Sequence, residues 1–270
     1  MDIRRGGDGG SQRGKAARQP RRALAPDSLV TPFQQFFASA PVACPYVAGR
    51  VERKLIVELA GHDAPGFYDD LSRAGFRRSH HFAYRPACRQ CSACVPVRID
   101  VAQFTDTRST RRLRNLNRDH TARVSGSGAT PEQFRLFMAY QRVRHSDSDM
   151  AAMSYGEYRG MVEDTPVRSA VVEFRDGAGR LAAVSLIDRL DDGLSAVYSF
   201  YDPAEPRRSL GTWSILWLVD ECRRLGLPYV YLGYWIPDSP KMAYKARFTG
   251  LERLVAGGWI ETAAVPVAAG

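Results

Sequence analysis

The clearest chemical signal in the chain is a group of three cysteines, Cys88, Cys91 and Cys94, each separated from the next by two residues. This spacing lets thiolates turn inward on one tight loop, as the ligands of tetrahedral zinc and of iron–sulfur clusters do. A fourth ligand is then needed, and Cys44 is the candidate, because Cys222 falls in a segment with the pattern of an amphipathic helix, where a thiol packs as a small apolar residue. The sequence therefore predicts a zinc or iron–sulfur site formed by Cys44, Cys88, Cys91 and Cys94. The alternative is a set of reduced thiols that fill a loop core.

Two histidines, His80 and His81, precede the cysteine loop and offer nitrogen atoms as further ligands. The alternative for this pair is a place in a strand, with one ring facing in and the other facing out.

Basic residues are concentrated in two places, and their location says more than the formal net charge of +9. The segment up to Arg22 is rich in arginine and glycine and poor in apolar residues, so we expect a disordered leader over residues 1–27. The second segment, residues 108–118, would place Arg108, Arg111, Arg112 and Arg118 along one side of a helix, which suits a phosphate backbone. A solvated helix face is the alternative.

The composition is that of a globular protein. With 270 residues, 44% of them hydrophobic and 25% charged, the chain can bury the core of one large or two small domains. No apolar run approaches the ~20 residues that cross a bilayer, and we expect a cytoplasmic protein. That compartment keeps thiols reduced, which favours metal or redox chemistry over disulfides for the cysteine group.

Short strands and helices must position these residues in the first half of the chain. Apolar alternation and turn residues predict strands over 53–59, 77–84, 95–101 and 121–124, and helices over 65–74 and 108–117. The cysteine loop then lies between the strands 77–84 and 95–101.

The second half has stronger local signals. Thr130-Pro131 and the spacing of Ser154 and Glu157 each predict a helix start. Three apolar runs joined by turns, 168–174, 181–188 and 194–201, predict an antiparallel meander. A helix over 212–225, a strand over 229–232, a helix over 242–248 and a strand over 254–259 complete the order. This order is that of an N-acetyltransferase-like α/β fold, with a mixed, largely antiparallel sheet.

Several stretches together resemble a known family. They are Thr31-Pro-Phe33, Cys44-Pro-Tyr-Val-Ala-Gly-Arg50, Gly75-Phe-Arg-Arg-Ser79, the cysteine loop with Val95-Pro-Val-Arg98, Leu210-Gly-Thr212, Tyr231-Leu-Gly-Tyr-Trp-Ile236 and Lys241-Met-Ala-Tyr-Lys245. In order and combination they are similar to the bacterial aspartate/glutamate leucyltransferases, relatives of the arginyl-tRNA–protein transferases. The resemblance runs from about Leu29 to Leu254. One departure is that eukaryotic relatives carry a CxxC where this chain has Cys44-Pro-Tyr-Val47.

The resemblance implies an aminoacyltransferase of the N-end rule, which marks proteins for degradation. Its substrates would be leucyl-tRNA and proteins that begin with Asp or Glu, and leucine would pass to their α-amine. It also implies an acyltransferase (GNAT)-like C-terminal domain that takes aminoacyl-tRNA rather than acetyl-CoA, needs no cofactor for the chemistry, and has no membrane partner. The stretch 208–213 agrees, because it lacks the glycine pair that cradles a pyrophosphate.

Candidate site residues follow from that reaction. An acidic N-terminal side chain calls for arginine, and Arg50, Arg78 and Arg98 lie in the implied N-terminal motifs, with surface salt bridges as the alternative. Tyr201 and Asp202 end the third meander strand, where such a fold opens its cleft. Asp202 would hold the amine or pass its proton; the alternative is a turn before Pro203.

The remaining candidates belong to the C-terminal motifs. The third catalytic candidate, Tyr234, is carried by the motif 231–236. Lys241, Tyr244 and Lys245 combine charge with an aromatic face able to hold the tRNA acceptor end, as Arg111 and Arg112 would hold phosphates. An ordinary helix surface is the alternative.

These expectations divide the chain into a leader (1–27), a smaller α/β N-terminal domain with the cysteine loop (28–128), an acyltransferase-like domain (129–260) and a flexible tail (261–270). Two other functions stay open at this stage. One is arginyl transfer, which needs an acidic pocket for the amino acid. The other is a zinc-stabilised RNA-binding module without catalysis, which leaves the C-terminal pattern unexplained.

Overall fold

The structure is a computed structural model that describes residues 34–146, 148–256 and 258–262. The expected leader (1–27), the stretch Thr31-Pro-Phe33 and residues 263–270 of the expected tail lie outside the described residues.

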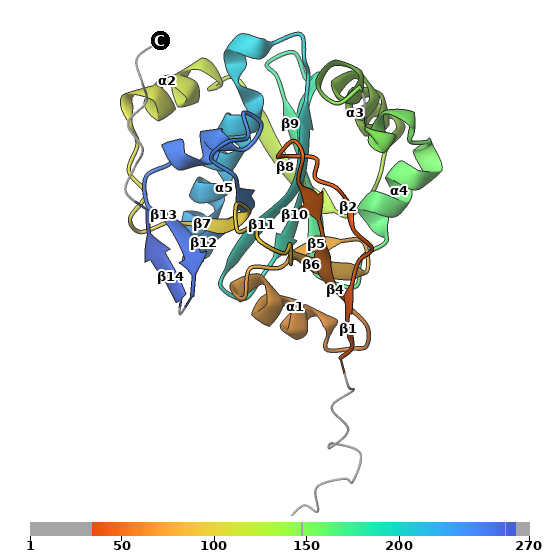
Figure 1. Ribbon diagram of the computed structural model, residues 1–270. Helices are drawn as coiled ribbons and strands as arrows, with labels where there is room; N and C mark the ends of the chain where they lie inside the picture. Colours follow the sequence, from red (N-terminus) through yellow and green to blue (C-terminus); the bar gives the residue numbers. More distant parts are fainter. Residues whose placement is uncertain (1–33, 147, 257, 263–270) are drawn as a thin grey trace, which may run out of the picture. The chain divides into compact units, whose positions relative to one another are not determined.

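A mixed eight-stranded sheet forms the centre of the described part (Figure 1). In spatial order its strands are β14 (Gly258–Glu261), β13 (Leu251–Val255), β7 (Val95–Asp100), β12 (Tyr229–Trp235), β11 (Gly193–Tyr201), β10 (Leu181–Arg189), β9 (Ser169–Arg175) and β8 (Thr121–Gly126). Every neighbouring pair is antiparallel except β11 and β12, which are parallel. The expected α/β class with a largely antiparallel sheet is confirmed.

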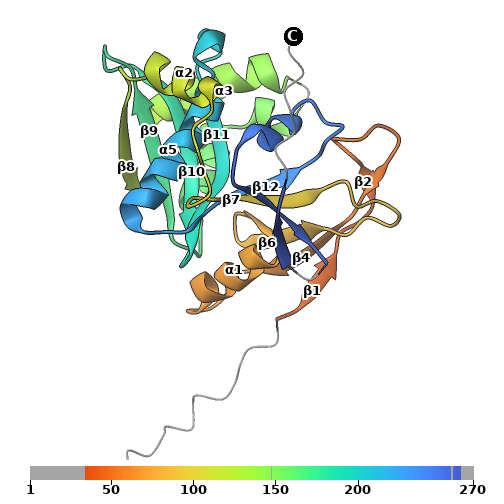
Figure 2. The same ribbon diagram turned by 90° about the vertical axis from the view of Figure 1, so that its left-hand side faces the viewer.

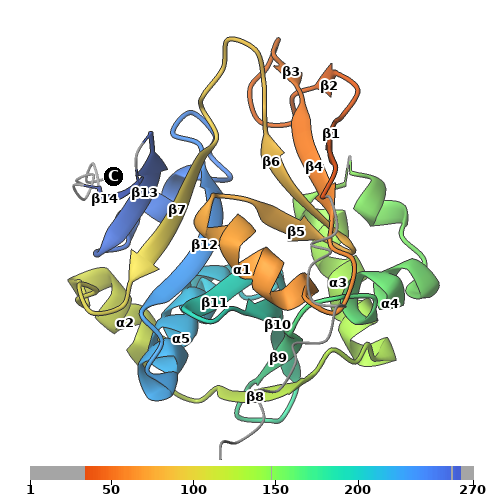
Figure 3. The same cartoon turned by 90° about the horizontal axis from the view of Figure 1, so that it is seen from below.

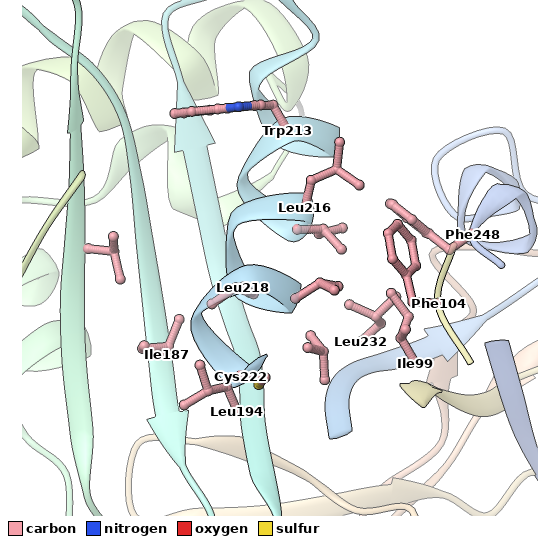
Figure 4. Close-up of a cluster of buried hydrophobic side chains, with 14 of the residues drawn as sticks. Ile99, Phe104, Ile187, Leu194, Trp213, Leu216, Leu218, Cys222, Leu232 and Phe248 are labelled. Carbon is pink, nitrogen blue, oxygen red and sulfur yellow. The ribbon is translucent and has the colours of Figure 1, made fainter. Parts of the chain in front are cut away.

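Helix α5 (Leu210–Leu225) makes the crossover that a parallel pair requires, and it packs on one face of the sheet (Figure 2). Its apolar side enters a core with Ile99, Ile187, Leu194 and Phe248, in which Cys222 is fully buried as a small apolar residue (Figure 4). The helix ends at Gly226, whose φ of 68° is the left-handed conformation that suits a helix C-terminus. α2 (Arg108–Leu116) packs against α5.

Two helices cover the other face of the meander, α3 (Pro131–Arg144) and α4 (Tyr155–Glu163), with a short 3₁₀ turn, η2 (Asp149–Ala152), between them (Figure 1). Both expected helix starts are confirmed, since the Thr130 and Ser154 side chains each accept from the backbone three residues on, in complete capping boxes. Phe137 and Tyr158 each pack edge to face against Phe200 at the centre of this second core.

A smaller sheet carries the N-terminal motifs, in the order β1 (Phe36–Ala38), β4 (Lys54–Glu58), β6 (Phe82–Pro86) and β5 (Arg77–Ser79) (Figure 3). α1 (Ala64–Arg73) packs with it through Tyr68 and Leu71, and a two-stranded ribbon pairs β2 (Val42–Ala43) with β3 (Val51–Glu52). The expected single strand 77–84 is wrong. The chain turns back there, because His80 takes a left-handed φ of 52° and starts a hairpin.

Two C-terminal expectations also need correction. Residues 242–248 form a 3₁₀ turn, η4 (Ala243–Arg247), rather than an α-helix, since so short a segment gains little from helix propagation. The expected strand 254–259 is two strands, β13 and β14, because the chain reverses between Val255 and Gly258.

Two strands of the large sheet, β7 and β8, come from the expected N-terminal domain (28–128). β7 pairs with β12 on one side and with β13 on the other, and the described residues from Gln34 onward form one compact unit. The boundary at residue 128 stays a prediction. No helix in the described part of the chain is long and apolar enough to span a membrane.

Candidate functional site

The two parallel strands of the large sheet separate along their length and leave an opening. β11 and β12 pair only over Gly193–Ser195 and Tyr229–Tyr231, and beyond these residues each strand pairs with its other neighbour alone. On β11 the register with β10 shifts, so that Val197 is an extra residue in the strand. Side chains from β5 and η4 lie at this opening.

Arg77 of β5 lies in the opening. Its Nη2 donates to the carbonyl oxygens of Ala196 and Val197, both at 2.8 Å. On the opposite strand, a Cβ placed on Gly233 would lie 2.6 Å from Cδ and 2.7 Å from Cζ of Arg77, so only glycine leaves room for this side chain. Sequence reasoning chose its neighbour Arg78; alternation along a strand would have put both arginines forward, one for each face.

Lys245 of η4 lies beside Arg77 and is buried, with 6% of its surface exposed. Its Nζ donates to Tyr234 O at 2.5 Å and to Met242 Sδ at 3.4 Å. Burial and then the positive charge of Arg77 lower the pKa of Lys245 to about 7. The ammonium is therefore not presented to solvent, and its expected contact with tRNA phosphates stays a prediction.

Tyrosines form one wall of the opening. Tyr201 OH accepts from Arg144 Nη2 at 3.0 Å, and its ring meets Tyr140 edge to face at 4.9 Å. Tyr244 is close to both Tyr201 and Arg77: burial and then Tyr201 raise its pKa to about 12, against a lowering by Arg77. Lys241 is exposed nearby, close enough to lower the pKa of His145 after burial and together with Arg144.

Asp202 faces a different surface. Its carboxylate accepts from Ala204 N at 2.9 Å, so it caps the turn that follows β11. It also lines an open groove of about 380 Å³, together with residues of α3 and of the β9–β10 turn. The carboxylates of that groove are Glu132, Asp176, Asp202 and Glu205, and its cations are Arg135 and Arg180.

The third catalytic candidate, Tyr234, is engaged by backbone. Its hydroxyl lies 3.0 Å from Gly75 O and 3.1 Å from Tyr84 O, and the side chain is buried. Burial, and then the neighbouring Tyr84, raises its pKa far above the usual range of tyrosine. This hydroxyl links β12 to the small sheet.

The three arginines expected to bind an acidic N-terminus differ in what they contact. Arg78 is buried and holds Asp188 through two bonds, Nε to Oδ2 at 2.7 Å and Nη2 to Oδ1 at 2.8 Å. Arg50 is exposed, and its Nη1 donates to Gln90 O at 3.3 Å.

Arg98 is enclosed by a carboxylate and aromatic rings. Its Nε donates to Glu252 at 2.7 Å and its Nη1 to Tyr231 OH at 3.1 Å. The guanidinium lies 3.4 Å from the ring centroid of Tyr229 and 4.4 Å from that of Trp259. The charges of Arg78 and Arg98 are thus already balanced by carboxylates within the fold.

The basic helix α2 has both exposed and paired arginines. Arg111 and Arg112 are exposed, with Arg111 Nη1 donating only to Asp106 O at 3.1 Å, while Arg114 pairs with Asp106 and Asp220. The two predicted phosphate contacts are therefore available to a ligand.

Three of the four cysteines, Cys44, Cys88 and Cys91, lie near enough to Cys94 to affect its pKa, although the four come from two loops. Burial and then the neighbouring thiols of Cys44, Cys88 and Cys91 raise the pKa of Cys94 to about 11. All four are free and partly buried. Among the described residues, no group of three or more His, Cys, Asp or Glu side chains has the geometry of a metal site. Four grouped thiols suit zinc or an iron–sulfur cluster by chemistry, and the site stays a prediction.

The two histidines lie away from that loop, in the turn between β5 and β6. His80 starts the turn, and His81 Nε2 lies 2.6 Å from Asp164 Oδ1. The expectation that they line a strand is wrong, because the hairpin places both in its turn.

Comparisons with known proteins match two family models and several relatives to most of this chain. A family model described as "Arginine-tRNA-protein transferase, N terminus" matches residues 42–112, and one described as "Arginine-tRNA-protein transferase, C terminus" matches residues 132–255. A relative named aspartate/glutamate leucyltransferase from Paramagnetospirillum magneticum is 55% identical over 83% of this chain and 92% of its own length. A relative of the same name from Gluconobacter oxydans is 50% identical over 86% of this chain and 97% of its own length.

Solved structures show more distant similarity. L-PGS from Bacillus licheniformis is 14% identical, with a TM-score of 0.42 over 66% of this chain and 51% of that one. A GCN5-related N-acetyltransferase from Kribbella flavida is 13% identical, with a TM-score of 0.33 over 59% of this chain and 54% of that one. Similarities of this size carry no argument here.

Proposed function

The chain belongs to the arginine-tRNA-protein transferase family, and on that premise we propose that it transfers leucine from leucyl-tRNA to the α-amine of proteins that begin with Asp or Glu. The observation that carries this proposal is identity of 50–55% with relatives named aspartate/glutamate leucyltransferase, over most of both chains. On the same proposal, the protein acts in the cytoplasm as an enzyme of the N-end rule.

The reaction asks for positioning rather than for a covalent nucleophile. The neutral α-amine of the acceptor attacks the ester carbonyl of leucyl-tRNA, an amide bond forms, the ester C–O bond breaks, and the tRNA leaves as a 3′-terminal alcohol. The amine gives up one proton and the leaving oxygen gains one. The protein must orient both substrates, relay that proton and stabilise the oxyanion.

The opening between β11 and β12 supports this chemistry. It brings the hydroxyl of Tyr201, held by Arg144, close to Tyr244, and the charge of Arg77 acts on both Tyr244 and Lys245. A tyrosine hydroxyl beside positive charge can donate a hydrogen bond to a developing oxyanion. We assign that role to Tyr201, and we place the tRNA phosphates on Arg111, Arg112 and Lys241.

Asp202 fits a supporting role in this scheme. Because its carboxylate caps the turn after β11, it fixes the end of the strand that presents Tyr201. Tyr234 likewise fixes β12 on the other side of the opening.

Arginyl transfer is the second candidate function, and the groove beside Asp202 is the observation that favours it. A cationic amino acid calls for carboxylates, which this groove supplies, although Arg135 and Arg180 line it too.

One assay separates the candidates. Purified protein is incubated with labelled leucyl-tRNA or arginyl-tRNA and with peptides that begin with Asp, Glu or Gly. We expect leucine on the Asp and Glu peptides alone. Transfer of arginine in its place would establish the second candidate, and equal labelling of the Gly peptide, or no transfer beside an active relative, would contradict both.

The four cysteines belong to the same proposal as a structural metal or cluster site. Cys44 and the loop 88–94 lie far apart in sequence, so a shared ion would hold the two loops together. Elemental analysis and an absorption spectrum of protein purified without oxygen test this, with Cys91→Ser as the variant and Cys222→Ser as the control outside the group. Stoichiometric zinc or iron that Cys91→Ser loses supports the site. Absence of metal together with four freely titratable thiols would mean that the cysteines only pack the loops.

A further inference from the structure

Arg77 differs from the other buried arginines of the N-terminal motifs in its partners. Arg78 and Arg98 each have a carboxylate at 2.7 Å, whereas the hydrogen bonds of Arg77 go to two neutral carbonyl oxygens. Within the described residues, Arg77 has no ion pair. A partly buried guanidinium without an anion costs free energy of folding. The fold nevertheless keeps this charge, and the described side chains do not neutralise it.

The surroundings of Arg77 are built for a guanidinium. Past Ser195 the strands no longer pair, the extra residue Val197 turns two successive carbonyls toward the gap, and Gly233 leaves the space that the side chain fills. Only Nη2 is used by these carbonyls, which leaves the remaining guanidinium donors for another group.

A second unbalanced cation lies next to it. Lys245 is buried and hydrogen-bonded only to Tyr234 O and Met242 Sδ, with no carboxylate partner among the described residues. Two neighbouring cations repel each other, and a bound anion between them would relieve the repulsion of both.

We propose that Arg77, with Lys245 beside it, is the subsite that binds the side-chain carboxylate of the acceptor's first residue. This inference rests on the proposed function, because it assigns the acidic specificity of that reaction to one residue. A planar carboxylate matches the free edge of a guanidinium and can accept two hydrogen bonds from it.

The location favours a carboxylate over a tRNA phosphate. Arg77 lies inside the sheet opening and close to Tyr244, which in turn is close to Tyr201 at the place proposed for bond formation. The exposed arginines of α2 already offer phosphate contacts at the surface. The acidic side chain belongs to the same residue as the reacting amine, so it would bind at Arg77 while the amine lies at the place of bond formation, and this position would select for the acidic residue itself.

The test uses the full chain with leucyl-tRNA and paired peptides that begin with Glu or Gln and are otherwise identical. Arg77→Gln should lower kcat/KM for the Glu peptide about 100-fold or more and leave the Gln peptide nearly unaffected, so that the Glu/Gln preference collapses. The KM for leucyl-tRNA should stay within about twofold. Arg85→Gln is the matched control: this exposed arginine on β6 contacts only Ala74 O and the ring of Phe76, and its loss should leave the preference intact.

Other outcomes overturn the inference. An equal fall for both peptides would make Arg77 a purely structural clamp, and a large rise in the KM for leucyl-tRNA would make it a phosphate contact. If Arg77→Gln is unfolded by circular dichroism, Arg77→Lys decides by the same ratio, because it keeps the charge without the planar fork and should reduce the preference about tenfold. A preference unchanged in Arg77→Lys and in Lys245→Met would contradict the inference. Failure of the wild-type protein to transfer leucine would instead contradict the proposed function.

Discussion

The two ends of the β11–β12 strand pair differ in whether their charged side chains have partners of opposite charge. Where the strands are hydrogen-bonded, charges are balanced: Arg78 holds Asp188, and Arg98, Tyr231, Asp192 and Arg73 form a continuous chain of hydrogen bonds. Where the strands separate, the basic side chains Arg77 and Lys245 have no carboxylate partner among the described residues. The hydrogen-bonded (closed) end thus stabilises the fold. The separated (open) end keeps polar groups that a substrate can bind.

The largest expected effect comes from breaking the balance at the closed end. In Asp188→Asn the buried guanidinium of Arg78 loses its anion, and we expect the free energy of unfolding to fall by about 3–5 kcal/mol. Urea denaturation followed by circular dichroism measures this. Asp70→Asn, which removes an exposed partner of Arg73, is the control and should change stability by less than about 1 kcal/mol. A small change in Asp188→Asn would mean that the two ends do not differ in this way.

A smaller effect is expected from pH at the open end. The pKa of Lys245 is about 7 in the folded protein and near 10.4 in an unfolded chain, so the unfolded state binds the extra proton between these values and stability rises with pH there. Compared with Lys245→Met, the wild-type protein should gain up to about 2.5 kcal/mol of stability from pH 6 to pH 9. Urea denaturation of both proteins at these two pH values measures the gain. Parallel pH curves for the two proteins would remove Lys245 from the set of buried cations.

The smallest expected effect concerns the basic surface of α2, which lies outside both ends of the strand pair. Arg111→Ala with Arg112→Ala should reduce the slope of log affinity for tRNA against log salt by about one to two units, because two phosphate contacts are lost. Filter binding at several salt concentrations measures it, with Arg159→Ala on α4 as the control. A slope unchanged by the double substitution would return α2 to a solvated helix face.

Local signals in the sequence predicted local structure well. The Thr130 and Ser154 capping boxes and the meander turns depend on residues a few positions apart, and all of them are present in the structure. The hairpin at His80 was missed because a histidine at positive φ has no strong sequence signal.

Residues distant in sequence determine which basic side chains of the site are neutralised, and a single sequence does not reveal these partners. Arg78 is neutralised by Asp188 and Arg98 by Glu252, whereas Arg77 meets only carbonyl oxygens, and nothing in the order of these residues distinguishes the three. Lys245 looked like a surface cation because the five-residue turn that buries it was read as a helix. Sequence patterns therefore identified the segments that form the opening but not the side chains whose charge is free.

The place of β7 has a consequence for how the chain reaches its fold. This strand ends at Asp100, and both strands that flank it, β12 from Tyr229 and β13 from Leu251, are synthesised much later. Both hydrogen-bonding edges of β7 therefore have no partner until the residues between Asp100 and Tyr229 have been synthesised, and such long-range pairing folds slowly and exposes unpaired edges to aggregation. The small sheet with α1 can assemble early, but the wall of the opening that β12 provides forms only after Tyr229–Trp235 has been synthesised.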